Sequence, residues 1–307
     1  DSKWQSVTVP HDWAIYGPFS YLKDERAAAM SRDGLSEAAE PSGRTGGLPF
    51  VGVGWYRTEF DVPQFQAGKR ATILFDGAMS HANVYINGQK VGYWPYGYNS
   101  FHFDITKYLK PGEKNTLAVR LENLPESSRW YPGAGLYRNV HLIITEDAYI
   151  PVWGTYITAP SVNEKFAKVN VRTKVVLPEG ADPAKYSVET SVWNPNKQKL
   201  TAVRTSLAQM KYNNNQAEQE FVIQAPSLWS PEMPTLYSAE TRLYEGDKLK
   251  DIYTTPFGIR SIEIIPDKGF FLNGKRTVFK GVCNHHDLGP LGAAVNDAAI
   301  RRQIRIL

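Results

Sequence analysis

Three adjacent polar side chains, His285, His286 and Asp287, are the best candidates for ligand binding in this 307-residue sequence. They follow a short apolar run, so we expect them at the carboxyl end of a strand, where a β/α barrel presents its ligand-binding side chains. Because neighbouring side chains on an extended segment point to opposite sides, only one histidine should face a ligand. The alternative, a histidine that hydrogen-bonds backbone carbonyls within a loop, stays open. Metal binding is disfavoured because a third well-spaced ligand is lacking.

A second candidate group is Arg129 with Trp130 and Tyr131, in a turn that contains two glycines. An arginine fork beside aromatic faces suits a hydroxyl-rich or anionic ligand. A packed corner that joins two strands is the alternative interpretation for Trp130 and Tyr137. His11, Asp12 and Trp13 could bind a ligand in the same way, but we expect them to pack between domains.

Acidic side chains form no recognisable catalytic pair in this sequence. Glycosidic hydrolysis needs two carboxyl groups roughly 5 Å apart for retention of configuration and further apart for inversion. Nothing places two of the candidates in one cleft, and Asp104 is better explained as a turn or capping residue. Serine-nucleophile, Walker, dinucleotide and His-Glu-x-x-His motifs are absent. We therefore expect no cofactor and no complete catalytic apparatus from the candidates considered, which are Asp12, Asp76, Asp104 and Glu122.

The histidines should be positioned by a β-hairpin and a following helix. Asn273-Gly274 tolerates the positive φ of a tight turn and lies between the apolar runs 270–272 and 277–279. The second strand then enters the polar loop 284–289. Strand, loop and helix are how a β/α unit begins.

The predicted helix begins after Asn296, a residue type that caps helices, and places Ile300, Ile304 and Leu307 on one face. One β/α unit cannot bury its own helix, so we expect further barrel units to be missing from this chain. The tail should then be disordered, docked against a sandwich, or buried against another copy.

Alternating apolar and polar residues predict an antiparallel sandwich of jelly-roll type in the first half of the chain. A second Asn-Gly turn, at residues 87–88, should pair Ile86 with Gln89 and Val84 with Val91. Residues 23–49 are expected to form a long surface loop, either a functional lid or disordered. After Tyr149, a further set of short alternating strands suggests an immunoglobulin-like sandwich without a disulfide.

Composition excludes several function classes. The formal charge of +4 arises from 35 basic and 31 acidic residues without a basic block, which disfavours nucleic-acid binding. Cys283 is the only cysteine, so an intramolecular disulfide is impossible. Apolar runs are too short for a membrane span. The high aromatic content suits sugar-handling proteins, although rings serve cores more often.

Six motifs are distributed along the whole chain: Val9-Pro10-His11-Asp12-Trp13, Gly54-Trp55-Tyr56-Arg57, the segment that begins Trp130-Tyr131-Pro132-Gly133, the segment that begins Leu228-Trp229-Ser230-Pro231, Phe257-Gly258-Ile259-Arg260 and Gly281-Val282-Cys283-Asn284-His285-His286-Asp287. Together, and in this order, they resemble glycoside hydrolase family 2, which includes β-galactosidases, β-glucuronidases and β-mannosidases. The resemblance implies a sugar-binding jelly roll, an immunoglobulin-like domain and the first strand of a catalytic barrel.

The resemblance also implies a retaining mechanism with two glutamates on later barrel strands, which have no counterpart before Leu307. By this resemblance, His285 contacts the sugar ring and Arg129 lies where the jelly-roll loop lends a polar residue to the site. Familiar β-galactosidases carry an aspartate near Arg129, so the sugar identity stays open.

We therefore predict a mostly β chain with a jelly roll over residues 1–147, an immunoglobulin-like sandwich over 148–262 and a truncated TIM barrel from 263 to 307. The expected function is that of the inactive amino-terminal part of a β-galactosidase; a β-glucuronidase, a β-mannosidase or a stand-alone carbohydrate-binding module are the alternatives. Expected partners are a β-glycoside and a second copy of the chain. Localisation stays open, with a periplasmic or secreted bacterial protein favoured. The predicted substrate-binding residues are Arg129, His285, His286 and Asp287.

Overall fold

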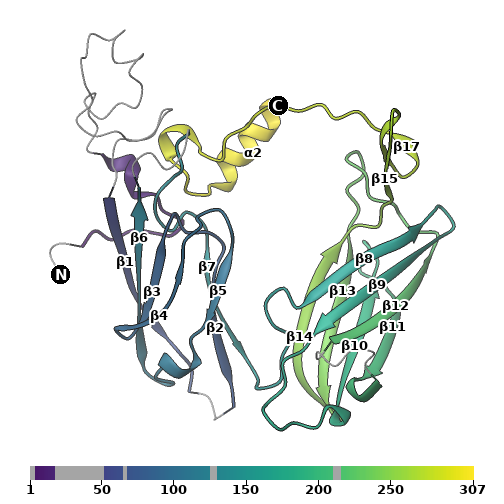
Figure 1. The fold of residues 1–307 in the computed structure, drawn as a ribbon, viewed down its shortest axis with the longest axis horizontal. Helices are drawn as coiled ribbons and strands as arrows, with labels where there is room; N and C mark the ends of the chain where they lie inside the picture. The colour runs from purple at the N-terminus through teal and green to yellow at the C-terminus, as the bar shows by residue number, and fades with distance from the viewer. Residues whose placement is uncertain (1–3, 18–51, 65–67, 125–129, 210–215) are drawn as a thin grey trace. The chain divides into compact units, whose positions relative to one another are not determined.

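The computed structural model describes residues 4–17, 52–64, 68–124, 130–209 and 216–307 and divides the chain into two compact units (Figure 1). The first unit comprises Asp1–Ile144 together with Cys283–Leu307, and the second comprises Thr145–Val282. The end of the chain thus returns to the unit in which the chain began. The predicted loop at 23–49 and Arg129 lie outside the described residues.

The first unit contains a sandwich of two antiparallel sheets. Apolar residues of successive strands alternate between the interior and the outside, as the sequence predicted, and Val84, Val119 and Leu121 are fully buried between the sheets. One sheet has the order β1 (Gly52–Asp61), β6 (Lys114–Asn123), β3 (Ala82–Ile86), β4 (Gln89–Trp94), and the other has β5 (Phe101–Asp104), β2 (Arg70–Phe75), β7 (Val140–Thr145).

The hairpin at Asn87 is confirmed, with Ile86 opposite Gln89, but its predicted register is wrong further along. Val84 lies opposite Gly92, not Val91, because a β-bulge after Val84 shifts the pairing. Gly92 faces an aromatic ring, and a Cβ atom there would lie 2.4 Å from Phe103 Cε1. The bulge therefore places the one residue without a side chain against that ring.

The second unit contains a sandwich of seven strands in two sheets. Its predicted inward positions are confirmed: Val169, Val188 and Leu243, for example, have no exposed surface. The sheet orders are β11 (Lys199–Ser206), β10 (Tyr186–Trp193), β13 (Tyr237–Glu245), β14 (Lys248–Phe257) and β12 (Gln216–Gln224), β9 (Phe166–Lys174), β8 (Thr155–Val162).

The Asn273-Gly274 turn is confirmed within a small sheet of β15 (Ile262–Ile265), β16 (Gly269–Leu272) and β17 (Lys275–Arg276). The strand predicted over 277–279 is wrong, since residues 277–288 form no strand. Val278 and Phe279 are 67% and 75% exposed, so their side chains pack against no core. Without a neighbouring strand, the backbone groups of this segment form no ladder of hydrogen bonds. The predicted β/α unit is not formed by the described residues, and the fold is mostly β.

The tail contains the 3₁₀ turn η6 (Gly289–Leu291) and α2 (Asp297–Ile306), the single α-helix of the described part of the chain. Asn296 caps α2 as predicted, and its side-chain oxygen accepts a hydrogen bond from Ala299 N at 3.0 Å. Residues before the helix dock on the first unit, where Val295 N donates to Tyr137 O at 2.9 Å. The helix itself has no fully buried residue, and Ile304 and Leu307 of its predicted apolar face are 64% and 72% exposed.

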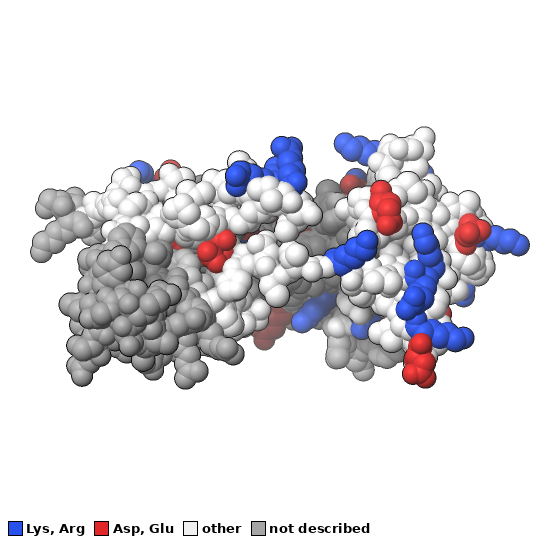
Figure 2. All heavy atoms as spheres, turned by 90° about the horizontal axis from the view of Figure 1, so that it is seen from above, with Lys and Arg blue, Asp and Glu red and all other residues white. Residues whose placement is uncertain are grey.

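On the face drawn in Figure 2, basic side chains stand in separate groups with acidic ones between them. No helix in the described ranges has the length and apolar character that a membrane span requires.

Candidate functional site

The carboxylate of Asp12 joins three segments of the first unit and is completely buried. Its Oδ1 accepts a hydrogen bond from Ala14 N at 3.0 Å and so caps the 3₁₀ turn η1 (Trp13–Tyr16). Its Oδ2 accepts from Ala293 N at 2.8 Å and from the Tyr131 hydroxyl. The amino-terminal segment, the loop after residue 130 and the carboxyl-terminal segment therefore meet at one buried carboxylate.

Two glycines allow the segments to approach so closely. Gly292 has φ 67°, and a Cβ atom there would lie 2.6 Å from Asp12 Oδ2. Gly133 has φ 85°, and a Cβ atom there would lie 2.4 Å from the Cβ of Ala293. Any larger residue at either position would both strain the backbone and separate the segments.

Burial sets the ionisation of the groups around this junction. Burial raises the pKa of Asp12, although hydrogen bonds from Ala293 N, the Tyr131 hydroxyl and Ala14 N oppose the shift. Burial and the Asp12 carboxylate raise the pKa of Tyr131, so its hydroxyl stays protonated and donates. Burial lowers the pKa of His11, whose Nδ1 lies 2.7 Å from the Tyr56 hydroxyl.

An aromatic surface, called here the aromatic wall, lies beside the junction and consists of Tyr96, Tyr98, Trp130 and His285. Trp130 Nε1 donates a hydrogen bond to the Tyr98 hydroxyl at 2.9 Å. The Trp130 and His285 rings meet edge to face at 6.4 Å, and those of Tyr96 and Tyr98 at 5.5 Å. Trp130 is 41% exposed, so a large part of its ring faces solvent.

The two adjacent histidines point to opposite sides. His285 has 59% of its side chain exposed and belongs to the wall, with its Nδ1 4.0 Å from Asp287 Oδ1. His286 packs edge to face against Tyr98 at 5.3 Å, and its Nε2 lies 3.1 Å from Pro132 O. His286 thus has the backbone-carbonyl contact that the alternative interpretation described, whereas His285 is available to a ligand.

The alternative interpretation of Trp130 and Tyr137 was a packed corner between two strands, but only Tyr137 is buried. Its hydroxyl donates a hydrogen bond to Gly97 O at 2.8 Å. Asp12 was predicted to have a role in interdomain packing, whereas its hydrogen bonds connect segments within one unit. The available signal was an aspartate directly before a short helical turn, which suggests a cap and nothing more. Its bond to Ala293, 281 residues away, has no local signature.

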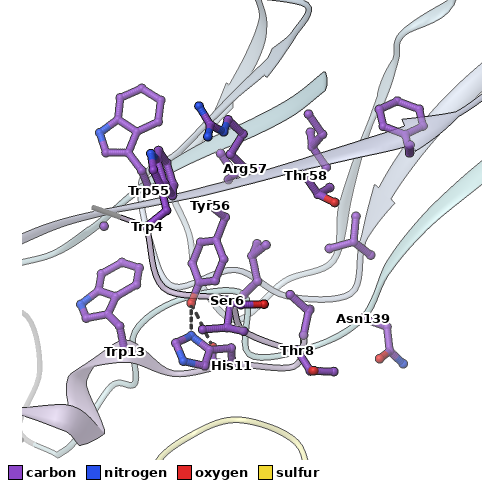
Figure 3. A pocket seen from close by; sticks show the side chains of 18 of the residues that line it. Trp4, Ser6, Thr8, His11, Trp13, Trp55, Tyr56, Arg57, Thr58 and Asn139 are labelled. Atoms are coloured by element: carbon purple, nitrogen blue, oxygen red, sulfur yellow. Dashed lines mark hydrogen bonds between the residues drawn. The ribbon is translucent and has the colours of Figure 1, made fainter. Parts of the chain in front are cut away.

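A groove of about 1080 Å³ opens elsewhere in the first unit (Figure 3). The His11–Tyr56 hydrogen bond joins two of the side chains that line it (Figure 3). Ile73 of β2 and Leu117 of β6 also line the groove, so both sheets contribute to it. The groove is the edge of the sandwich interior between β1 and β7. It does not include Trp130 or His285, so it is separate from the aromatic wall.

The three other acidic candidates each pair with a basic neighbour. Asp76 Oδ2 lies 2.8 Å from His141 Nε2, Asp104 Oδ2 lies 3.3 Å from Arg70 Nη1, and Glu122 pairs with Arg120. Each of these acids has its own partner, and no two of them pair with each other. The described part of the chain also contains no group of three or more histidine, cysteine or acidic side chains arranged to hold a metal ion.

Comparison with known proteins supplies the family. Residues 45–146 match the model described as glycosyl hydrolases family 2, sugar binding domain, and residues 149–260 match that of glycosyl hydrolases family 2. A beta-galactosidase of Bacteroides ovatus is 41% identical over all of this chain and 34% of its own length, and a beta-glucuronidase of Bacteroides fragilis is 33% identical over 83% of this chain and 39% of its length. A solved beta-glycosidase from Bacteroides vulgatus superposes with a TM-score of 0.84 at 30% identity, over 100% of this chain and 36% of its own.

The chain spans about a third of the length of the curated relatives that it matches, 34% for the first of them. The two matched domains follow one another in the order that the motifs indicated, and together they account for both sandwiches of the structure. The chain belongs to glycosyl hydrolase family 2, and it corresponds to the amino-terminal portion of its relatives, with the sugar-binding and immunoglobulin-like domains.

Proposed function

We propose that this chain is the non-catalytic amino-terminal part of a retaining exo-β-glycosidase that hydrolyses β-galactosides, with O-glycosyl bonds of oligo- or polysaccharides as its targets. One observation carries the proposal: Trp130 of the sugar-binding domain and His285 of the carboxyl-terminal segment form a single exposed surface. The name of the Bacteroides ovatus relative supports galactosides as the substrate.

In this proposal the chain provides sugar contacts and a longer protein provides the chemistry. A retaining mechanism requires an acid/base and a nucleophile carboxyl roughly 5 Å apart. Asp76, Asp104 and Glu122 are committed to basic partners, and Asp12 is enclosed by its hydrogen-bond donors. We therefore infer that both catalytic carboxylates lie outside these 307 residues and that the chain alone does not hydrolyse glycosides.

Of the four predicted substrate-binding residues, we propose that three contact the sugar and that one has a structural role. Arg129, His285 and Asp287 contact the substrate, whereas His286 holds the segment on Pro132 O. We also propose residues 1–147 as the sugar-binding domain and 148–262 as the immunoglobulin-like domain. Residues 263–307, which form no β/α unit in this chain, would begin the barrel in the longer protein.

A β-glucuronidase is the second candidate, because the Bacteroides fragilis relative bears that name. Hydrolysis of aryl β-galactoside, β-glucuronide and β-mannoside by the chain and by the gene's full-length product separates these functions. We expect activity only in the full-length protein, with the galactoside preferred, and a lower kcat/KM in its His285→Ala variant. Activity of the 307-residue chain itself would refute the proposal, and a preference for the glucuronide would replace the substrate.

A further inference from the structure

The aromatic wall is rigid because its members restrain one another. The hydrogen bond from Trp130 Nε1 to the Tyr98 hydroxyl, 2.9 Å long, fixes the plane of the indole. Tyr98 is in turn held between Tyr96 and His286, at ring separations of 5.5 and 5.3 Å. His286 bonds to Pro132 O, so the wall is anchored to the same loop that carries Trp130.

The wall also remains open to solvent where a ligand would approach. Trp130 and Tyr96 are 41% and 54% exposed, so both side chains present surface to solvent. A rigid exposed ring offers apolar area to a ligand with little loss of conformational entropy. His285 adds hydrogen-bonding nitrogen atoms at the edge of the ring.

We propose that the aromatic wall is a stacking platform for the apolar face of a neutral β-galactopyranoside, with Trp130 under the sugar ring and Tyr98 as a positioning residue that fixes the indole plane. This inference rests on the proposed function and names the sugar class that the site accepts. The axial 4-hydroxyl of galactose leaves neighbouring C–H groups together on one face, and such a face suits an aromatic ring.

The same chemistry predicts selectivity against uronic acids. The face of an aromatic ring carries negative potential, so it attracts polarised C–H groups and repels a carboxylate held above it. A glucuronide has only equatorial hydroxyls, so its C–H groups are divided between the two faces of the ring, and it also carries a carboxylate. Trp130 should therefore contribute more to binding of a galactoside than of a glucuronide.

The first test is kinetic and uses the full-length gene product with aryl β-galactoside. Stacking is made equally in the ground state and transition state, so Trp130→Ala should raise KM about fivefold to tenfold with kcat nearly unchanged. Tyr98→Phe keeps the ring and removes its hydroxyl, and should raise KM about threefold. The matched control is Trp55→Ala, a tryptophan of the same unit that is 47% exposed outside the wall.

The second test needs no hydrolysis and uses the 307-residue chain labelled with 5-fluorotryptophan. Its Trp130 signal is assigned by the Trp130→Phe variant. Methyl β-galactoside should shift this signal more than methyl β-glucuronide does, whereas the Trp55 signal stays in place. Tyr98→Phe should reduce the shift.

The outcomes separate the two proposals. Galactoside hydrolysis with KM of Trp130→Ala within twofold of wild type would overturn the platform and leave the proposed function intact. A full-length protein that hydrolyses none of the glycosides would overturn the proposed function, and the fluorine experiment would still decide on the platform. A Trp130 signal that galactoside does not shift, or that glucuronide shifts more, would overturn the platform and its selectivity.

Discussion

Replacement of Asp12 by alanine should release the carboxyl-terminal segment from the sugar-binding domain. The carboxylate is fully buried and accepts hydrogen bonds from Ala14 N, Ala293 N and the Tyr131 hydroxyl. Alanine accepts none of them, so three buried donors lose their partner at once.

The magnitude follows from these contacts. A buried donor without a partner costs about 1–3 kcal/mol, but the variant also no longer buries a carboxylate. We expect Asp12→Ala to lower the free energy of unfolding of the first unit by about 3–5 kcal/mol, which is less than the sum for three unpaired donors because the cost of burying the carboxylate is no longer paid. Asp12→Asn should cost less, about 1–2 kcal/mol, because its amide oxygen can still serve Ala293 N and Tyr131.

Two measurements on the 307-residue chain check this expectation. Urea unfolding gives the stability of the first unit, and amide hydrogen exchange of Ala293 reports directly on docking. The matched control is Asp104→Ala: Asp104 also accepts a backbone hydrogen bond, from Thr106 N at 2.9 Å, but its side chain is 51% exposed. That variant should cost about 1 kcal/mol, as loss of an exposed cap does, and leave Ala293 protected.

The reasoning would be refuted by an Asp12→Ala chain in which Ala293 exchanges as slowly as in wild type. It would equally fail if Asp12→Ala and Asp104→Ala cost the same. Exchange in the second unit should be unchanged in both variants, which shows that a loss of protection is local.

Four further predictions concern the same unit. Burial raises the pKa of Asp12, so over a range of pH the folded chain keeps a proton that the unfolded chain releases. The free energy of unfolding should therefore fall as pH rises from the ordinary aspartate pKa through the raised one. In urea unfolding measured at several pH values, Asp12→Asn should lack this pH dependence. The pKa of His11 is lowered by burial and acts in the opposite sense, so stability should fall as pH drops below the ordinary histidine pKa through the lowered one. Gly292→Ala should undock the segment and cost about 1–3 kcal/mol more than Gly289→Ala, since both have positive φ but only a Cβ at 292 meets Asp12; equal thermal shifts would contradict this. Deletion of 297–307 should change the free energy of unfolding by less than about 0.5 kcal/mol, because α2 has no buried residue, and light scattering of the two chains should differ if the helix joins copies.

The sequence by itself determined the strands and turns. Period-two alternation identified the inward residues of both sandwiches, such as Val119 and Val188, because the pleat of a strand sends alternate side chains to one face. The two Asn-Gly pairs marked their hairpins, because these residues tolerate positive φ, and Asn296 marked the start of α2. The strand at 277–279 failed because short apolar runs carry no information on whether a pairing partner exists.

Only the tertiary structure decided which of these pieces meet. The register of β4 depends on the fit of Gly92 to Phe103, a contact that no local pattern records. The candidate site depends on Asp12, Trp130 and His285, which are far apart in the chain and which come together through one buried carboxylate and a hydrogen-bonded pair of rings. Local patterns fix the direction in which a side chain points, whereas its neighbours are fixed by the packing of distant segments, and a site made by three segments is therefore visible only in the fold.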